Sequence, residues 1–567
     1  SFPTRRSSDL FRDYITVQKG ERFSYASVYS NNTCDIHPPL YYWIINTICS
    51  FFPDSFSWWY GFSFNLLMLV LIQVFLYKLT LLYSKKKWLS LACCALYGAG
   101  NGALMTFTFI RQYALMTFLL ILFTYLSAMI YEHQADDKAR MGDAGLSLGS
   151  ASGKTIDKYI VMAAIAAYLS FMTLYLSIAF IGVFTAAFCL YLLLHKRFRL
   201  MLKYGLSILM SLILMIASYP AGIKHMQNYD SNGQMIWSFP VQLRMYINRI
   251  MAYNFGLYIN PYGTPFFKIM LPFVGLFILF ACMLYIPLRN EAWMPGLIKR
   301  LKDSPKAFWN FIKNADHVWL FVLLAIAGEL IMVNLSADIY KMGVFATRYV
   351  FAMFPFAVFI MVGLIDKLLE IIIDPKNKRP KMGQKIRLCV SYALCIVIML
   401  LTHINSDADM LSSDYTGAYD LAREFEGKNI VMILEDNRYA WTLTCFPRYI
   451  YKADNVFVTY PEQMQDNNNK LIDSDKHIDY VIIPALNYTT SGEETKLVNE
   501  LLGVSDDATE EEKNSKLLID TSTYDQKHEE DAIKCNDHIK ELNNGSGYDL
   551  MCCLSINTGL DYVIRMR

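Results

Sequence analysis

Long apolar blocks dominate this sequence of 567 residues and restrict the folds open to it. They have about the length that a helix needs to cross a hydrocarbon core of roughly 30 Å. Hydrophobic residues make up 54% of the chain and charged residues only 18%, a smaller charged share than soluble domains carry. The chain is therefore predicted to be a polytopic, all-α membrane protein. We expect ten spans, at about residues 57–83, 88–108, 113–131, 159–174, 176–194, 203–220, 267–287, 317–335, 348–370 and 387–405.

Basic residues in the connecting segments predict the orientation of these spans. If the loop that holds Asp35 and His37 lies outside, the inside segments carry roughly 24 Lys and Arg residues, against roughly 9 in the outside loops before the tail. Lys and Arg accumulate on the cytoplasmic side of membrane proteins, which favours this orientation. The loops are short and bacterial in style, so the plasma membrane is the expected location.

Residues 1–10, SFPTRRSSDL, are interpreted apart from the rest of the chain. They resemble the in-frame translation of a common sequencing adapter, and we exclude them from the fold as an artefact. A chain that starts in an outside loop needs a preceding helix or signal to reach it. We therefore expect the natural protein to have eleven spans, the first of them before residue 11.

Residues 406–567 differ in character from residues 11–405, which hold the spans. Short β-rich runs alternate there with polar, helix-prone segments such as SGEETKLVNELL, which predicts a small extracytoplasmic α/β domain. The tail has no Gly-rich phosphate loop and no G-x-S-x-G motif, so we expect it to support acceptor binding or assembly. The strand-like runs are 429–434, 455–460, 479–486, 516–520, 548–554 and 560–566.

Several classes of partner are disfavoured by composition and spacing. A net charge of +2 without a sustained basic stripe argues against nucleic acid. The 12 cysteines are scattered, with no CxxC pair or Cys/His cluster that would indicate zinc. The run GSASGKT lacks the full spacing of a nucleotide-binding loop. We predict no specific cofactor, and the sequence leaves a requirement for a divalent metal open.

The segment CDIHPPLYYW, Cys34 to Trp43, places ionisable groups and two prolines directly before an apolar run. Proline in the first turn of a helix loses no hydrogen bond, because those N–H groups have no intrahelical partner. A helix is therefore predicted to start after Pro39. The Tyr and Trp rings that follow favour a membrane interface. Asp35 and His37 are expected at the outer surface of the bilayer.

This segment resembles the D-x-H-P-P-L signature of the GT-C membrane glycosyltransferases, specifically the dolichyl-phosphate-mannose protein mannosyltransferase and ArnT-like branch. Arg111-Gln112-Tyr113 is similar to the R-x-Y that opens a span in that family. Arg348-Tyr349 is similar to the start of its R-Y-x-x-P-x-x-P pattern, and YPAGIKH, residues 219–225, begins a large external loop. These positions cover most of residues 11–405.

The resemblance implies an inverting transferase that moves a sugar from a polyprenyl-phosphate donor to a protein, lipid or polysaccharide acceptor outside the membrane. The family's catalytic base is an acidic residue of the first external loop, which would precede this chain. Residues 11–567 alone are therefore expected to be inactive. In Thr173-Leu174-Tyr175 a leucine stands where many relatives have histidine, which puts that histidine's role in doubt here. The candidate catalytic-site residues are Asp35 and His37, and the candidate donor-binding residues are Arg111, Tyr113, Lys224, His225, Arg348 and Tyr349.

Plainer structural roles compete with these assignments. Asp35 is also a good helix cap, and His37 could be a solvated interface histidine. Arg111 and Arg348 could be anchors that extend to lipid headgroups. Glu329, inside the span 317–335, has either a proton or ion role or a hydrogen bond to a neighbouring helix.

Two other functions remain alternatives to a transferase. A non-catalytic glycolipid-binding protein of the envelope would lack the catalytic base but bind the same lipid. A lipid or solute transporter would show inverted internal repeats and paired broken helices near the membrane midplane. No such repeat is visible in the sequence, which makes the transporter the weaker alternative.

Overall fold

The computed structural model describes most of the expected membrane part and five strands of the tail. Asp35 and the expected span 267–287 lie outside the described residues, as does the strand-like run 516–520. The described residues are 16–34, 37–143, 149–227, 239–257, 317–336, 343–373, 380–405, 423–433, 450, 452–459, 477, 479–484, 548–556 and 559–566.

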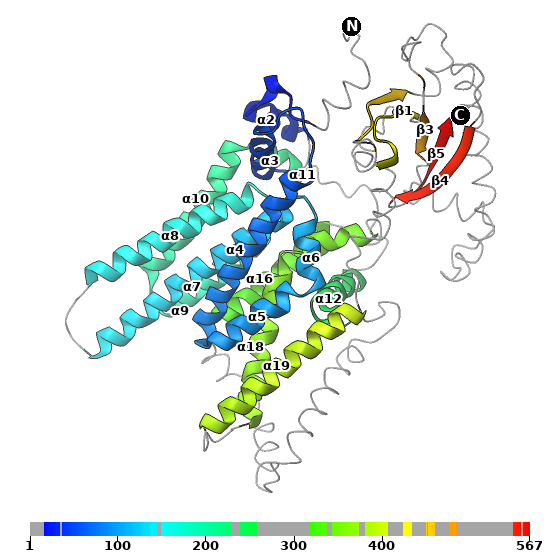
Figure 1. The fold of residues 1–567 in the computed structure, drawn as a ribbon. Helices are drawn as coiled ribbons and strands as arrows, with labels where there is room; N and C mark the ends of the chain where they lie inside the picture. The colour runs from blue at the N-terminus through cyan, green and yellow to red at the C-terminus, as the bar shows by residue number, and fades with distance from the viewer. Residues whose placement is uncertain are drawn as a thin grey trace.

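The described part of the chain is mostly helical, and its long helices form one bundle (Figure 1). Short elements precede the first long helix: η1 (Lys19–Glu21), α2 (Tyr25–Thr33) and α3 (Leu40–Ser50). The bundle helices up to the large loop are α4 (Trp59–Ser84), α5 (Lys87–Gly98), α6 (Asn101–Thr108), α7 (Tyr113–Asp143), α8 (Gly149–Phe171), α9 (Ser177–Leu194) and α10 (Phe198–Ser218). The later elements are α11 (Ala221–Gln227), α12 (Phe239–Phe255), α16 (His317–Ser336), η3 (Gly343–Val350), α18 (Met353–Ile373) and α19 (Pro380–Asn405).

Six of the described helices are long and apolar enough to cross a membrane, or seven if one bent pair counts as a single span. They match expected spans: α4, α7, α9, α10, α16 and α19. The bent pair is α5 and α6, which the sequence predicts as one span at 88–108 and which meet at an angle of 62°. The helices α8 and α18 coincide with the expected spans 159–174 and 348–370.

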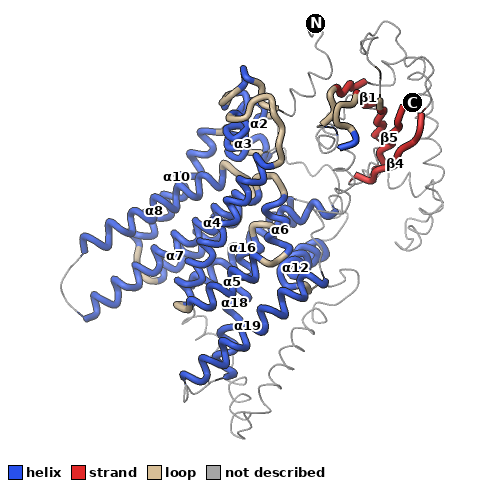
Figure 2. The backbone as a smooth tube through the Cα atoms, viewed as in Figure 1, coloured by secondary structure: helices blue, strands red, loops and turns tan. Residues whose placement is uncertain are grey.

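The centre of the bundle is α7, which packs mainly against α4 and α8. Its side chains from Tyr113 to Tyr131 are largely buried, and Phe123 stands edge-on to Phe184 of α9. The outer helices show the reverse pattern, because α10 exposes Leu206, Leu209 and other large apolar side chains along its length. Helix α10 lies at the side of the bundle (Figure 2). Exposed apolar residues on such a peripheral helix are typical of contact with lipid.

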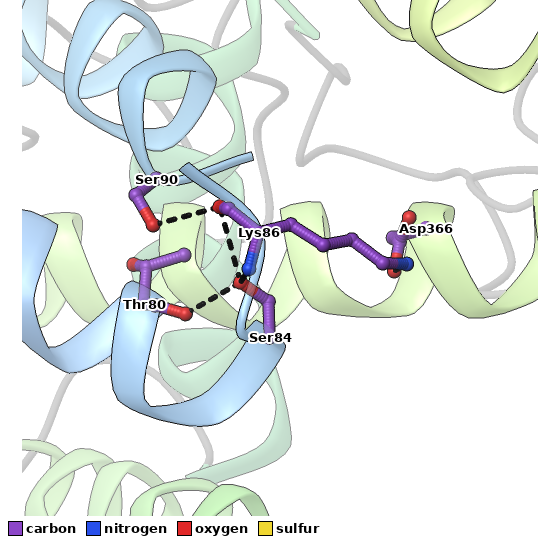
Figure 3. A network of polar contacts seen from close by, with 5 residues as sticks. All are labelled: Thr80, Ser84, Lys86, Ser90 and Asp366. Atoms are coloured by element: carbon purple, nitrogen blue, oxygen red, sulfur yellow. Dashed lines mark hydrogen bonds and ion pairs between the residues drawn. The ribbon is translucent and has the colours of Figure 1, made fainter. Parts of the chain in front are cut away.

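The turn between α4 and α5 is tied to α18 by an ion pair (Figure 3). The Lys86 ammonium lies 2.6 Å from the Asp366 carboxylate, which is only 5% exposed, while Lys86 is 24% exposed. The turn itself is closed by the Ser84 hydroxyl, which donates to the Thr80 carbonyl at 2.7 Å, and by Ser90, which donates to the Lys86 carbonyl at 3.1 Å. The neighbouring Lys85 adopts the left-handed conformation that ends α4 and pairs with Glu132 of α7.

The described strands of the tail form one five-stranded mixed sheet in the order β2-β1-β3-β5-β4. Strand β1 pairs in parallel with β2 and β3, while β5 pairs antiparallel with β3 and β4. All five strands overlap runs that the sequence predicts as strand-like. The helix-prone segments of the predicted α/β domain lie outside the described residues, so that domain stays a prediction. The bounds are β1 (Asn429–Ile433), β2 (Asn455–Thr459), β3 (Tyr480–Pro484), β4 (Tyr548–Ile556) and β5 (Gly559–Met566).

Candidate functional site

The described residues of the signature segment, Cys34 and 37–43, lie at the end of α2, just before α3 and in the first turn of α3. Helix α3 begins at Leu40, directly after Pro39, so the predicted helix start is confirmed. The helix ends at Ser50. The His37 carbonyl accepts a hydrogen bond of 3.1 Å from the Asn32 side chain at the end of α2. The His37 ring lies 6.4 Å from the ring of Tyr42, one turn into α3. His37 is thus placed between the two helices, and the position of Asp35 is not described.

Contacts from distant parts of the chain hold the end of α2 and the start of α3. The backbone N–H of Leu40 donates to the Met172 carbonyl at 3.1 Å, beside the turn between α8 and α9. The end of α2 is held by His225 of α11, whose Nε2 lies 3.1 Å from the Thr33 carbonyl oxygen. Because a carbonyl only accepts, His225 donates there, and its Nδ1 lies 3.0 Å from the Tyr175 hydroxyl. His225 therefore links α2, α11 and the α8–α9 turn.

Two motifs far apart in the sequence meet at the start of α7. The Arg348 guanidinium donates to the Tyr349 hydroxyl at 3.2 Å, and its Cζ lies 5.0 Å from the centre of the same ring. The Tyr113 ring stands edge-on to the Tyr349 ring, with centroids 6.3 Å apart. We call Arg348, Tyr349 and Tyr113 the arginine–tyrosine cluster. It joins α7 to η3, where the sequence predicted the start of a span.

The turn between α6 and α7 places Arg111 next to this cluster. The Asn65 amide on α4 donates to the carbonyls of Phe107 and Phe109, at 3.1 and 2.9 Å, and so holds the backbone just before Arg111. Arg111 itself is exposed. Gln112, the next residue, is 1% exposed, and neither polar atom of its side chain has a hydrogen-bond partner in the described chain. Sequence analysis missed Asn65 and assigned no role to Gln112.

Electrostatics connect the signature helix with the two arginines. Burial raises the pKa of the Tyr41 hydroxyl, Tyr42 adds to the increase and Arg111 opposes it, so Arg111 lies within reach of α3. The guanidinium group of arginine stays protonated in proteins, so Arg111 and Arg348 both carry a positive charge. The Tyr41 hydroxyl has no hydrogen-bond partner among the described residues. The region thus combines fixed positive charge with buried hydrogen-bonding groups that lack a described partner.

The remaining predicted residues fall outside this group. Lys224 is exposed on α11, beside the His225 bridge. Glu329 is fully buried on α16, and neither of its carboxylate oxygens has a hydrogen-bond partner in the described chain. The hydrogen bond to a neighbouring helix that the sequence offered as a structural role is therefore not found among the described residues. Among the described residues, no three His, Cys, Asp or Glu side chains come close enough to hold a metal ion.

No family model matches this sequence, and no curated protein matches it as a relative. Three solved structures are similar at low identity. The crystal structure of ArnT from Cupriavidus metallidurans bound to undecaprenyl phosphate has a TM-score of 0.43 and 9% identity, over 88% of this chain and 92% of that chain. The same protein in the apo state has a TM-score of 0.41 and 10% identity, over 87% and 92%.

The third is the crystal structure of an Archaeoglobus fulgidus oligosaccharyltransferase in the apo form. Its TM-score is 0.35 at 11% identity, over 84% of this chain and 68% of that chain. With all three TM-scores below 0.5, the assignment to a family still depends on the sequence motifs.

Proposed function

We propose that this chain is a GT-C-type membrane glycosyltransferase that transfers a sugar from a polyprenyl-phosphate donor to an extracytoplasmic acceptor. The proposal starts from the D-I-H-P-P-L segment and the two arginine–tyrosine motifs, which resemble that family. Its sugar and its acceptor class, whether protein, lipid or polysaccharide, stay open within the proposal.

The observation that carries the proposal is the arginine–tyrosine cluster. A guanidinium donates in a planar fork that suits two phosphate oxygens, and it keeps its charge at any physiological pH. Arg348 is pre-oriented by the Tyr349 ring and hydroxyl, so little side-chain freedom is lost when an anion binds. Arg111 adds a second positive charge from the α6–α7 turn. Such a pair fits a lipid phosphate at a membrane interface.

The chemistry would be a single displacement at the anomeric carbon. The acceptor oxygen forms a bond to that carbon, the bond to the donor phosphate oxygen breaks, and the phosphate leaves with the electron pair. A carboxylate takes the acceptor proton, and Asp35 and His37 belong to the segment that would face the acceptor. Arg348 and Arg111 would stabilise the negative charge that grows on the departing phosphate. The orphaned Tyr41 and Gln112 groups could bind hydroxyl groups of the sugar.

Binding of polyprenyl phosphate tests the cluster without requiring turnover. The Arg348→Ala variant loses a charged contact worth about 1.5–3 kcal/mol, which corresponds to a roughly 10- to 100-fold weaker Kd. Arg249→Ala is a matched control, because Arg249 makes the same kind of bond to the Tyr253 hydroxyl, 2.8 Å long, within α12. Equal affinities for wild type and Arg348→Ala would refute the assignment of Arg348 to the phosphate.

Turnover separates the proposed enzyme from a glycolipid-binding protein. The complete protein, given lipid-linked sugars and an acceptor, should release free polyprenyl phosphate. Binding without release across a broad donor panel would favour the glycolipid-binding alternative. The transporter alternative gains one feature, the bend between α5 and α6, but that hypothesis calls for a second, related break, and the described helices contain one bent pair.

A further inference from the structure

A set of exposed aromatic side chains surrounds the N-terminal end of α4, and it is independent of the proposed transferase chemistry. We call it the aromatic rim: Phe23, Phe51, Phe52, Trp58 and Trp59. Phe51 is 63% exposed and Trp59 is 66% exposed, which is unusual for side chains of this size in water. The rim is held together by ring contacts, with Phe23 edge-on to Phe51 at 5.5 Å and Phe52 stacked on Tyr60 at 4.9 Å.

The rim is a built surface rather than a loose loop. The Arg22 guanidinium donates to the Ser50 carbonyl at 2.7 Å, and the Phe23 N–H donates to the Ser50 hydroxyl at 2.8 Å. These bonds fasten the segment before α2 onto the end of α3. Farther along, the Asp54 N–H donates to the Val17 carbonyl at 2.9 Å, and Lys19 pairs with the Asp54 carboxylate at 3.6 Å. The rings therefore present a fixed face.

This face continues a stripe of exposed apolar side chains along α4. Because an α-helix turns every 3.6 residues, Trp59 lies on the same side of α4 as the exposed Leu66, Val70 and Val74. The stripe ends at Lys78, whose ammonium lies over the Phe75 ring at 5.1 Å. From Trp59 to Lys78 the helix rises about 28 Å at 1.5 Å per residue. That length nearly equals the hydrocarbon thickness of roughly 30 Å.

We propose that the aromatic rim lies in the interfacial layer of the bilayer, with its rings among the glycerol and headgroup region of phospholipids. The α4 stripe faces the acyl chains, so its aromatic end falls at the boundary between hydrocarbon and headgroups. Trp settles at that depth because its ring is amphipathic, and Phe occurs beside Trp on the apolar face of helices that lie at this boundary. Arg22, stacked 5.5 Å from the Phe23 ring, adds a cation at the level of the lipid phosphates. The partner of this surface is therefore phospholipid.

Depth-dependent fluorescence quenching tests the proposal on the full chain in phosphatidylcholine vesicles. The emission of wild type minus that of Trp59→Phe isolates Trp59 from the other tryptophans. Vesicles contain lipid brominated either near the headgroup end or near the chain end, and iodide is added to the water in a separate series. Val70→Trp is the matched control in the middle of the stripe. Phe51→Trp provides a second reporter in the rim.

We expect the Trp59 and Phe51→Trp emissions to be lost more strongly with the shallow bromines than with the deep ones, and to resist iodide. The Val70→Trp emission should show the reverse order of the two lipids. Strong quenching by iodide would place the rim in water and overturn the proposal. Resistance to both lipids and to iodide would mean that protein covers the rim, which would overturn it as well.

Discussion

Breaking the ion pair between Lys86 and Asp366 should destabilise the bundle far more than breaking the adjacent ion pair between Lys85 and Glu132. Asp366 is 5% exposed and lies 2.6 Å from the Lys86 ammonium, which bridges the α4–α5 turn and α18. The Lys86→Met substitution keeps most of the side-chain volume but leaves a buried carboxylate without its cation. Removing one partner of a buried pair costs about 3–5 kcal/mol. Since Lys86 is 24% exposed and water screens the pair from that side, we expect the lower end, about 3 kcal/mol.

The assay is thermal unfolding of the purified chain in one detergent, followed by intrinsic fluorescence. For a chain of 567 residues, a loss of about 3 kcal/mol corresponds to a decrease in Tm of about 2–3 °C. Lys85→Met is the matched control, because Lys85 is the adjacent residue and also pairs with a carboxylate, Glu132, but is 62% exposed. An exposed pair contributes about 0–1 kcal/mol, so this variant should lose about 1 °C or less.

A double substitution distinguishes an unpaired charge from a general loss of packing. Replacing both partners, as Lys86→Met with Asp366→Leu, removes the buried charge together with its counter-ion. Such replacements are often neutral or stabilising, so the double variant should recover most of the lost Tm. The reasoning would be refuted by equal, small shifts in Lys86→Met and Lys85→Met. It would also be refuted if the double variant were as unstable as Lys86→Met alone.

Two further predictions concern buried polar groups. His225→Phe removes the donor to the Thr33 carbonyl and should increase amide hydrogen exchange across residues 29–34. The control Lys224→Ala, on the exposed side of α11, should leave this exchange unchanged. Equal exchange in both variants would contradict the bridging role of His225. Glu329→Leu removes a fully buried carboxyl group that has no hydrogen-bond partner in the described chain, so Tm should stay the same or rise. A decrease in Tm of several degrees would contradict this and would show that the carboxyl group stabilises the fold.

Much of the helical architecture follows from consecutive residues alone. The blocks 57–83, 176–194 and 317–335 each become one helix within about two residues of their expected bounds, because hydropathy and helix length are local properties. The expected span 88–108 forms two helices, α5 and α6, that meet at an angle of 62°, and hydropathy alone does not predict this bend. Glycines at 98, 100 and 102 surround the bend. A Cβ on Gly102 would lie 2.7 Å from the Phe354 ring, so the close approach of α18 depends on this glycine.

The candidate site also has features that local sequence predicts and features that depend on helix packing. The motif residues Arg111, Tyr113, Arg348 and Tyr349 could be selected from their positions at the ends of apolar blocks, and their roles stay predictions. That Tyr113 meets Tyr349 could not be derived, because no local pattern records which spans are neighbours. The role of Asn65 could not be predicted from the sequence, because its two carbonyl partners, Phe107 and Phe109, are more than 40 residues away in the chain.

The amino-acid sequence by itself determined that this protein is apolar and helical, that a helix starts after Pro39, and that cations accompany tyrosines at the ends of two blocks. Each of these depends on residues within a few turns of one another. Only the tertiary structure decided that His225 holds the end of α2 at Thr33, that Lys86 pairs with Asp366, and that Gln112 is buried without a described partner. Those contacts depend on how the helices pack, because burial and distance between remote segments set the strength of every polar interaction among them.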